Sequence, residues 1–444
     1  MIRFLTIGVL IAAVGVIAFL QHKTPSPPLP NLDDAHRDLS ESLAIFPGAE
    51  GFGTDTIAGR GGRVFVVETL ADTGSGSLRE ALNAKGPRTI VFSVGGVIEA
   101  ATNFVIADPF VTIAGQCAPA PGITLSGAGL SIRTHDVLVQ HLAIRIGDGP
   151  GHKPEDRDAI QVIGSEDGET SVFNIVIDHV SMSWAIDEGF STWYRGVRDV
   201  TVSHCLIAEQ LDNSLHPKGR HSKAVLIGDH SRRISLIRNV FAHSDDRNPT
   251  IKGDTSSLVV NNLVYNPGRW PVGYFDPEGS GPLASTLWDN QFIYGPSSQN
   301  EHAVVIVENN IAAGSQLHHS GNLGPHNDLL DIRSNVSPLV TSAPVTVKPL
   351  KRLDATVLEN ELLSNVGSRP NDRDANDRRI IQTITERRGT IIDSVAEVGF
   401  AKPTSSSTRL TLPPEPNSDD DGDGYSNLEA WLHSAAAQLE SPPE

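Results

Sequence analysis

The stretch 156–252 carries acidic side chains in its first part and basic side chains in its last part. Each set stands at the edge of a short apolar run that predicts a β-strand. Carboxylate oxygens are the ligands that a hard cation such as Ca²⁺ prefers, and Lys and Arg side chains pair with anions. The stretch therefore predicts a site that holds a cation and a polyanion side by side. The acidic residues are Asp156, Asp158, Asp187 and Glu188, and the basic residues are Lys223, Arg247 and Lys252.

The composition favours a turn-rich, all-β protein that does not bind nucleic acid. The 444 residues include 40 Gly and 29 Pro but only 5% aromatic residues, and apolar residues occur in many short Val/Ile/Leu runs. The formal charge of −18 opposes binding to phosphates, which needs a basic surface. An anionic polymer would also be repelled unless local basic residues or bound divalent cations reverse the field.

The N-terminus predicts export. Arg3 precedes an apolar run over 4–20, and a Pro-rich segment follows at 24–30. The run is slightly long for the core of a signal peptide and slightly short for a spanning helix. Residues 1–23 are therefore either a removed signal peptide or an uncleaved anchor, 24–45 form a linker, and the body is secreted or held at the cell surface. We expect no other contact with a membrane.

Seven short β-rich runs share one pattern, in which an apolar segment ends in His or Asn. The His and Asn positions are spaced by 20 to 38 residues, as expected for coils of three short strands with turns of variable length. One coil cannot bury its own apolar face, whereas stacked coils build a continuous core. The pattern predicts a right-handed parallel β-helix over 46–400, with a β-sandwich as the alternative. The shared positions are His141, His179, His204, Asn239, Asn262, Asn290 and Asn310.

The tail changes character after the repeats. Residues 370–396 are rich in Arg and Asp with helical spacing, 401–416 form a Ser/Thr/Pro linker, and an acidic loop leads into a helix within 417–440. In the loop, acidic residues alternate and Gly424 permits a sharp turn, which resembles the calcium loops of EF-hand and dockerin-like modules. A solvated acidic linker is the alternative. The second metal site predicted in this tail comprises Asp419, Asp421, Asp423, Asn427 and Glu429.

The middle stretch resembles the pectate lyases of polysaccharide lyase family 1. The resemblance covers about 46–400 and is most detailed over 156–265. Each motif alone is weak, but their order and spacing together are fairly specific. The motifs are Asp-x-Asp-Ala-Ile at 156–160, Val-Ile-Asp-His at 176–179, Ser-Trp-Ala-Ile-Asp-Glu at 183–188, Lys-Ala-Val-Leu at 223–226, Arg-Asn-Pro at 247–249 and Val-Val-Asn-Asn-Leu-Val-Tyr at 259–265.

The resemblance implies a calcium-dependent enzyme that cleaves polygalacturonate by β-elimination. Carried over by position, Asp156, Asp158 and Glu188 are expected to ligate Ca²⁺, with Asp187 as a substitute ligand. Lys223 and Lys252 are expected to bind substrate carboxylates, and Arg247 to abstract the proton. Electrostatics agrees with these roles, because Ca²⁺ and lysines would stabilise the enolate-like negative charge that develops when the proton is removed. A guanidinium, however, is not expected to deprotonate in proteins, so Arg247 alternatively orients the proton's path to water or hydroxide.

Two positions depart from the family pattern. Thr192 stands where the family has a second acidic ligand, and Lys252 stands where the family often has a second Arg, which loses the bidentate fork.

Asp178 and His179, at a corner of the repeat, are expected to be structural. The two cysteines, Cys117 and Cys205, are expected to be small core residues because no other cysteine or ligand spacing accompanies them.

Other functions predict other features. A polygalacturonate hydrolase would share the β-helix and its several Asp residues, and the Asp245-Asp246 pair invites that interpretation, but its Asn-Thr-Asp, Gly-His-Gly and Arg-Ile-Lys motifs do not occur in the chain. A lyase for methyl-esterified pectin would not respond to calcium. A non-catalytic, polysaccharide-binding or cell-surface β-helix remains the alternative from another class. We expect a monomer whose partner is an acidic polysaccharide.

Overall fold

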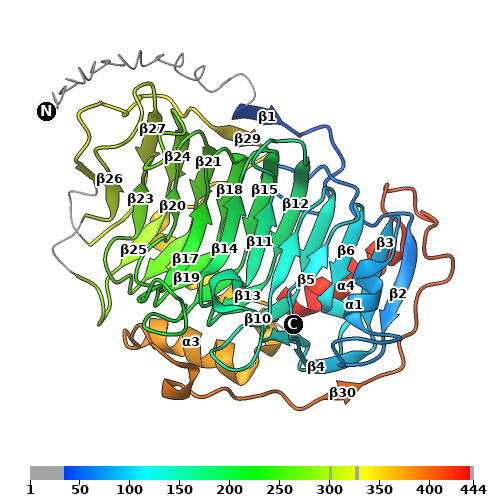
Figure 1. The fold of residues 1–444 in the computed structure, drawn as a ribbon. Coiled ribbons are helices and arrows are strands. Elements are labelled where there is room, and N and C mark those ends of the chain that lie inside the picture. The colour runs from blue at the N-terminus through cyan, green and yellow to red at the C-terminus, as the bar shows by residue number, and fades with distance from the viewer. Residues whose placement is uncertain (1–34, 300–302, 326–329, 441–444) are drawn as a thin grey trace, which may run out of the picture.

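The computed structural model describes residues 35–299, 303–325 and 330–440; the predicted signal or anchor, 1–23, lies outside the described residues. Short strands stack side by side along the molecule, and each coil contributes one strand to each of three sheets (Figure 1). Within each sheet, strands of successive coils pair in parallel. The predicted parallel β-helix is confirmed.

The first sheet consists of β2 (Arg63–Val67), β3 (Arg88–Phe92), β6 (Val111–Ala114), β9 (Val137–Gln140), β12 (Val172–Asp178), β15 (Val197–Ser203), β18 (Arg232–Ile237), β21 (Ser256–Val260), β24 (Ala284–Trp288) and β27 (Gln316–Ser320). The second sheet consists of β30 (Ser406–Ser407), β4 (Val94–Glu99), β7 (Ile123–Ser126), β10 (Leu142–Arg145), β13 (Ser181–Ser183), β16 (Leu206–Ala208), β19 (Val240–Ala242), β22 (Leu263–Tyr265) and β25 (Gln291–Ile293). The third sheet consists of β5 (Phe104–Ile106), β8 (Leu130–Ile132), β11 (Ile160–Ile163), β14 (Glu188–Trp193), β17 (Lys223–Ile227), β20 (Thr250–Ile251), β23 (Val272–Tyr274), β26 (Val305–Val307) and β28 (Leu330–Ile332).

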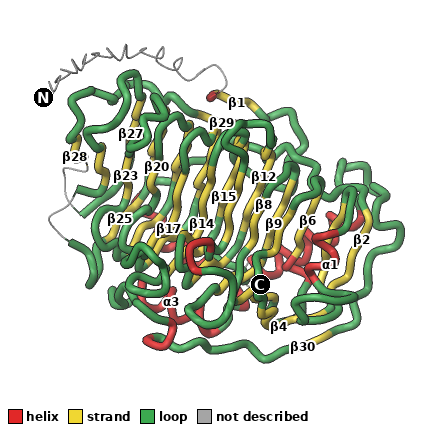
Figure 2. The backbone as a smooth tube through the Cα atoms, in the orientation of Figure 1, coloured by secondary structure: helices red, strands yellow, loops and turns green. Residues whose placement is uncertain are grey.

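Helices lie on the outside of this stack, while strands make up its body (Figure 2). Ser77 caps the N-terminus of the first helix, since its side chain accepts a hydrogen bond from the Glu80 backbone N–H. The α-helices are α1 (Leu78–Asn83), α2 (Leu358–Asn365), α3 (Ala375–Thr385) and α4 (Asn427–Glu440). Short 3₁₀ turns are η2 (Gly115–Cys117), η3 (Pro154–Asp156), η4 (Ala355–Val357), η5 (Pro370–Asp372) and η6 (Val395–Glu397), and β1 (His36–Asp38) pairs with β29 (Thr346–Lys348).

The recurring His and Asn side chains contact one another from coil to coil and form a ladder, but this ladder occupies two neighbouring positions of each coil rather than one. The rings of His141, His179 and His204 stack at 5.1 and 4.8 Å between centroids. One position later in the coil, Asn239 donates to Asn262 Oδ1, and the same contact continues through the next two coils at 2.9 Å. The ladder ends on Asn322, so the expectation for Asn310 was wrong: its Oδ1 instead accepts from the Asp276 backbone.

Two of the three sheets are covered on their outer faces. The N-terminal segment packs Phe52 and Leu39 on the first sheet, and α2 and α3 pack Leu358 and Ile380 on the second. On the third sheet, the outward residues of β17 and β20 instead line a pocket. The functional residues predicted from the sequence therefore lie along the face that the described segments leave accessible.

The tail packs against the body. In the segment expected to be a linker, β30 pairs antiparallel with β4, and α4 buries Leu428 and Leu432 against Val91 and Ala114 of the first sheet. Figure 1 shows α4 in red beside the blue strands of the first coils. The predicted helices at 370–396 and 430–439 correspond to α3 and α4. No helix in the described ranges is long and apolar enough to cross a membrane.

Candidate active site

A buried carboxylate cluster lies at the N-terminal ends of β11 and β14, two neighbouring strands in the middle of the third sheet. Asp158 precedes β11 and Glu188 opens β14, and the parallel pairing of these strands brings both beside Asp187. Their carboxylate oxygens lie within 4.8 Å of one another. Asp158 and Glu188 are only 3% and 1% exposed, so water screens their charges weakly. The sequence prediction that these three residues converge is consistent with this placement.

The cluster has the features expected of a cation site. Burial raises the pKa of Asp158 well above its usual range, and the charge of Asp187 raises it further, while the hydroxyl of Ser191 donates to Asp158 and opposes the shift. Glu188 Oε2 is buried and has no hydrogen-bond partner among the described residues. Converging buried carboxylates, one of which has an oxygen without a donor, fit a hard divalent cation such as Ca²⁺.

Arg247 lies against this cluster. It occupies the loop between β19 and β20 with a φ of 60°, and its carbonyl accepts a hydrogen bond from the Val225 backbone at 2.6 Å. Its Nη1 pairs with Glu188 Oε1. Burial lowers the pKa of Arg247, and Asp187 and Asp158 oppose that shift. The guanidinium thus remains charged and faces the acidic cluster with one-quarter of its side chain accessible.

The two predicted lysines lie further along the same face, each paired with a carboxylate. Lys223 Nζ lies 2.8 Å from Asp246 Oδ2. Lys252 Nζ lies 2.7 Å from Asp229 Oδ2 and 2.8 Å from Glu278 Oε1. Glu278 is the exposed partner, with about half of its side chain in solvent. Both lysines are buried, so their positions are held by these ion pairs.

The lysines and Arg247 line one pocket of about 330 Å³ together with aromatic side chains. Lys252 Nζ lies 5.4 Å from the centre of the Trp193 ring, and Arg269 lies 5.3 Å from that of Trp270. Flat rings beside cations suit a sugar carboxylate, because a ring packs on the apolar sugar face while the cation binds the charge. The lining residues are Trp193, Lys223, Leu226, Asp246, Arg247, Thr250, Lys252, Arg269, Trp270, Phe275, Pro277 and Glu278.

Asp156 is placed apart from the other predicted ligands. Its side chain is 44% exposed and pairs with Lys153 Nζ at 2.7 Å. It ends η3 and is not one of the residues whose ligand atoms converge with those of Asp158, although its charge helps to raise the pKa of Asp158. Thr192 lies on the inward face of β14, paired in register with Ile227, and is fully buried. It therefore contributes no ligand to the cluster.

The tail loop brings together three of its five predicted ligands. Asp419, Asp421 and Asp423 have carboxylate oxygens within 4.8 Å of one another, and all three are exposed. Asn427 instead donates to Asp420, and Glu429 pairs with Arg60 at 2.8 Å and caps the start of α4. Glu429 thus fixes the tail to the body.

The sequence interpretation missed two histidines beside the carboxylate cluster. His216 and His221 lie in the loop between β16 and β17, and their rings stack at 3.8 Å with an angle of 7°. Their Nε2 atoms lie 3.6 and 2.7 Å from Asp187 Oδ1. Burial lowers the pKa of His216, and His221 lowers it further. The only available sequence signal is the short spacing His216-Pro-Lys-Gly-Arg-His221.

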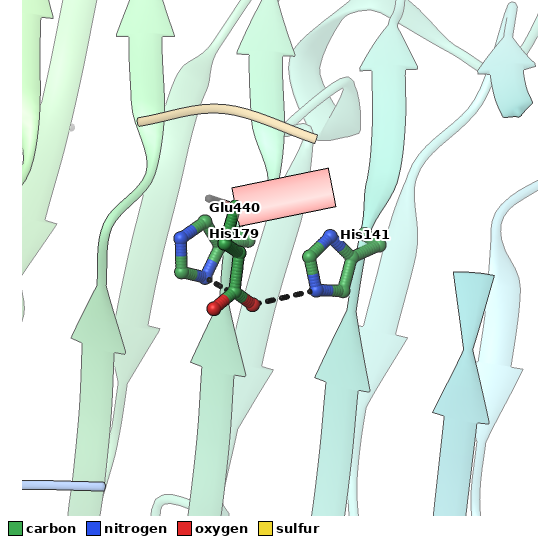
Figure 3. Close-up of side chains that lie close together, drawn as sticks. All are labelled: His141, His179 and Glu440. Carbon is green, nitrogen blue, oxygen red and sulfur yellow. Dashed lines mark hydrogen bonds and ion pairs between the residues drawn. The ribbon is translucent and has the colours of Figure 1, made fainter. Parts of the chain in front are cut away.

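A second histidine group joins the tail to the body (Figure 3). Glu440, the last residue of α4, lies 3.1 Å from His141 Nε2 and 3.6 Å from His179 Nδ1. Burial lowers the pKa of His179, but Asp178 overcomes this and raises it to about 9. A protonated His179 between two carboxylates holds the end of α4 in place. The structural role predicted for Asp178 and His179 agrees with this geometry.

Comparisons with known proteins agree with the motifs. No family model matches the chain. A protein of Aspergillus flavus named probable pectate lyase C is 38% identical over 280 residues, which cover 61% of each chain. Its counterpart in Neosartorya fischeri is 40% identical over 258 residues, 58% of this chain and 56% of that protein. The pectate lyase of Nicotiana tabacum is 27% identical over 240 residues, 49% and 56% of the two chains. The chain thus spans about three-fifths of the length of these relatives.

Solved structures share the fold. The major cedar pollen allergen, Jun a 1, superposes with a TM-score of 0.55 and 18% identity, covering 72% of this chain and 92% of that one. The thermostable pectate lyase PL 47 gives a TM-score of 0.52 and 14% identity, with 74% and 98% covered. These likenesses show the architecture alone. The resemblance to pectate lyases indicated by the motifs is therefore confirmed, through homologues of that name in sequence and through the parallel β-helix in fold.

Proposed function

We propose that this protein is a calcium-dependent pectate lyase that cleaves unesterified polygalacturonate, or a closely related uronan, by β-elimination to unsaturated oligosaccharides. The observation that carries the proposal is the position of Arg247 between a buried carboxylate cluster and a basic, aromatic pocket on one accessible face. Its support in sequence is the similarity to proteins named pectate lyase. Each part of this face has a role in such a reaction.

Substrate binding falls to the pocket. A uronate carboxylate fits beside Lys252 when Glu278, its exposed partner, moves into solvent. Lys223 lies nearer the cluster and is the cation for a carboxylate at the cleavage point. Neutralising that carboxylate is necessary because removal of the adjacent C5 proton places further negative charge on it.

The carboxylate cluster supplies the ligands for the metal. Asp158, Asp187 and Glu188 would hold Ca²⁺, and Asp156 would join them from the rim after leaving Lys153. When bound, Ca²⁺ would supply positive charge that stabilises the charge developing on a substrate carboxylate. Glu188 serves both groups, since its Oε1 pairs with Arg247 while Oε2 remains free for the cation.

Arg247 is the residue proposed at the proton. In β-elimination, the C5–H electrons form the C4–C5 double bond, the C4–O bond breaks, and the leaving oxygen takes up a proton. Burial lowers the pKa of Arg247, which favours proton acceptance, yet a guanidinium stays protonated at neutral pH. Arg247 therefore acts where hydroxide is available, by orienting the proton's path to it. This role predicts an alkaline activity optimum.

The test is the ultraviolet absorbance of the conjugated unsaturated product, measured on polygalacturonate at alkaline pH with calcium and then with chelator. We expect a signal that requires calcium and is lost by at least about a hundredfold in Arg247→Ala. Arg37→Ala, a substitution in the remote N-terminal segment, is the matched control and keeps full activity. A folded protein that binds polygalacturonate but never forms the product would instead be a binding module.

The same assay on methyl-esterified pectin completes the proposal. Esterification removes the charge that the lysines and calcium neutralise, so the proposed enzyme loses activity as esterification rises.

The exported location proposed for the protein is tested separately, by expressing the complete chain and finding whether it appears outside the cell or at its surface. Size-exclusion chromatography tests the proposed monomer.

A further inference from the structure

The carboxylate Asp187 belongs to two ligand groups at once. Its oxygens lie within 4.8 Å of those of Asp158 and Glu188, and also within 4.8 Å of nitrogen atoms of His216 and His221. Both histidines are at most 6% exposed. An all-oxygen group suits Ca²⁺, whereas imidazole nitrogen suits Zn²⁺ and other borderline divalent transition ions. The two groups thus offer one shared position to two classes of metal.

The contact between His221 and Asp187 is not a hydrogen bond. His221 Nε2 is buried and lacks a hydrogen-bond partner among the described residues, although Asp187 Oδ1 lies only 2.7 Å away. The oxygen therefore lies off the axis along which a ring N–H points. Two ligands of one metal ion show this geometry, because each directs a lone pair at the ion rather than at the other ligand. Glu188 Oε2 is a second buried oxygen without a partner beside the same carboxylate.

The second histidine has a different part. His216 Nδ1 accepts a hydrogen bond from the Lys218 backbone at 3.1 Å, so its neutral ring carries hydrogen on Nε2. That nitrogen has no lone pair to offer, and it faces Asp187 Oδ1 at 3.6 Å. His216 therefore orients Asp187 and packs on the ring of His221, which leaves His221 as the nitrogen ligand.

We propose that His221 and Asp187 form the nitrogen–oxygen core of a site that binds a borderline divalent transition ion such as Zn²⁺, in competition with Ca²⁺ at the carboxylate cluster that Asp187 shares with Asp158 and Glu188. The competition follows because one carboxylate cannot complete both coordination spheres. The calcium half of this inference rests on the proposed function, whereas the zinc half rests on His221 alone. Bound Zn²⁺ would displace the calcium ion on which the proposed reaction depends, and would inhibit it.

The other histidine group gives a natural control. His141 Nδ1 faces the Ser368 carbonyl at 2.9 Å, and Glu440 contacts both rings of that group. It lies on the first sheet, away from the carboxylate cluster, and is a separate place where zinc could bind. The neighbouring Asp178, His179 and His204 also have ligand atoms within 4.8 Å of one another and are a further place where zinc could bind. The substitution His141→Gln disrupts the first group and His179→Gln disrupts both, without touching the third sheet, so zinc bound at His221 can be told apart.

The experiment is calorimetric titration of the chelator-treated full chain with ZnCl₂ and with CaCl₂. We expect His221→Asn to weaken Zn²⁺ binding by at least about tenfold while Ca²⁺ binding changes by less than about threefold. His141→Gln leaves the Zn²⁺ affinity of this site unchanged, and saturating Ca²⁺ weakens Zn²⁺ binding in the wild type. Equal weakening of both metals in His221→Asn, or no change in Zn²⁺ affinity, would overturn the proposal.

A second measurement covers the case in which His221→Asn does not fold. The X-ray absorption spectrum of the Zn²⁺-loaded His179→Gln protein shows imidazole scattering around zinc if His221 is a ligand, and a shell of oxygen atoms alone overturns the proposal. Calcium binding with lyase activity but no zinc binding would refute this inference and leave the proposed function intact. Loss of calcium binding and of product formation would count against the proposed function instead.

Discussion

The substitution Asp158→Asn separates the charge of the carboxylate cluster from its shape. Asp158 is 3% exposed, and its oxygens lie within 4.8 Å of those of Asp187 and Glu188. Burial and the charge of Asp187 raise its pKa, so the folded protein disfavours its ionised form. Without metal, the substitution therefore removes a repulsion. With calcium, it removes a ligand.

The magnitude follows from the separation of the charges. Two unit charges about 5 Å apart, at an effective dielectric constant of about 20, repel by about 3 kcal/mol. The nearby guanidinium of Arg247 offsets part of this, and weakening of the hydrogen bond from Ser191 costs about 1 kcal/mol. We expect Asp158→Asn to unfold with about 1 kcal/mol more free energy than wild type in chelator. Calcium at about 100 times its Kd stabilises wild type by about 2.7 kcal/mol, so the order reverses.

Urea unfolding followed by tryptophan fluorescence measures both states. Asp156→Asn is the matched control, because that carboxylate is exposed and pairs with Lys153 on the surface. Its stability in chelator should lie within about 0.5 kcal/mol of wild type. If Asp158→Asn is less stable than wild type in chelator, the carboxylate is satisfied by protein donors, and the argument for a cation site fails. If calcium stabilises it as much as wild type, Asp158 is not a ligand.

Three further changes test other parts of the molecule. Asp178 raises the pKa of His179 to about 9 despite its burial. The stability that the protonated ring contributes is therefore complete below its unfolded pKa of about 6.5 and is lost as the pH rises through about 9. The free energy of unfolding should fall over that range by at most about 3 kcal/mol, and His179→Gln should flatten the fall. Glu278→Gln leaves Lys252 paired with Asp229 alone and should lower KM for polygalacturonate about two- to fivefold with kcat unchanged, measured from initial rates. Leu432→Ala should destabilise the docking of α4 by about 2–3 kcal/mol and expose the tail to limited proteolysis while the β-helix stays intact.

The parts predicted from the sequence are those that local pattern encodes. Each coil repeats the same order of strands, so a motif at the start of one strand lies beside the motif at the start of the next. For that reason the residues Asp158, Glu188, Lys223 and Arg247, spread over almost ninety positions in the sequence, could be expected on one face. Strand pairing such as that of Glu188 with Lys223 in register makes this concrete.

The parts that were missed depend on irregular segments or distant contacts. His216 and His221 lie in a loop without periodicity, and hydrogen bonds such as that from His221 N to the Asp212 carbonyl at 2.8 Å bring the loop back to the cluster. Asn310 follows the apolar strand β26, whereas Asn322 follows β27, whose residues are mostly polar, so an apolar pattern favours the wrong position. The docking of α4 requires an apolar face on the first coils that an amphipathic pattern in the tail does not reveal.

The acidity of the protein also has a consequence at the proposed site. Among the described residues of the pocket, of the cluster and of their ion-pair partners, four cations face seven carboxylates, so this face is not basic without metal. The cations are Lys223, Arg247, Lys252 and Arg269, and the carboxylates are Asp158, Asp187, Glu188, Asp229, Asp245, Asp246 and Glu278. A polyanion would be repelled from such a face, and a divalent ion changes the local charge by two units.

Metal removal should therefore weaken substrate binding as well as catalysis. Isothermal titration with oligogalacturonate, at a neutral pH where turnover is slow, measures binding with calcium and with chelator. We expect chelator to weaken binding by at least about tenfold, since two charges at an effective dielectric constant of about 20 contribute more than the 1.4 kcal/mol that this factor requires. Raising the ionic strength should reduce the difference, because salt screens the repulsion from the unmetallated face. If oligogalacturonate binds equally well in chelator, the lysines alone neutralise it, and calcium would act only at the chemical step.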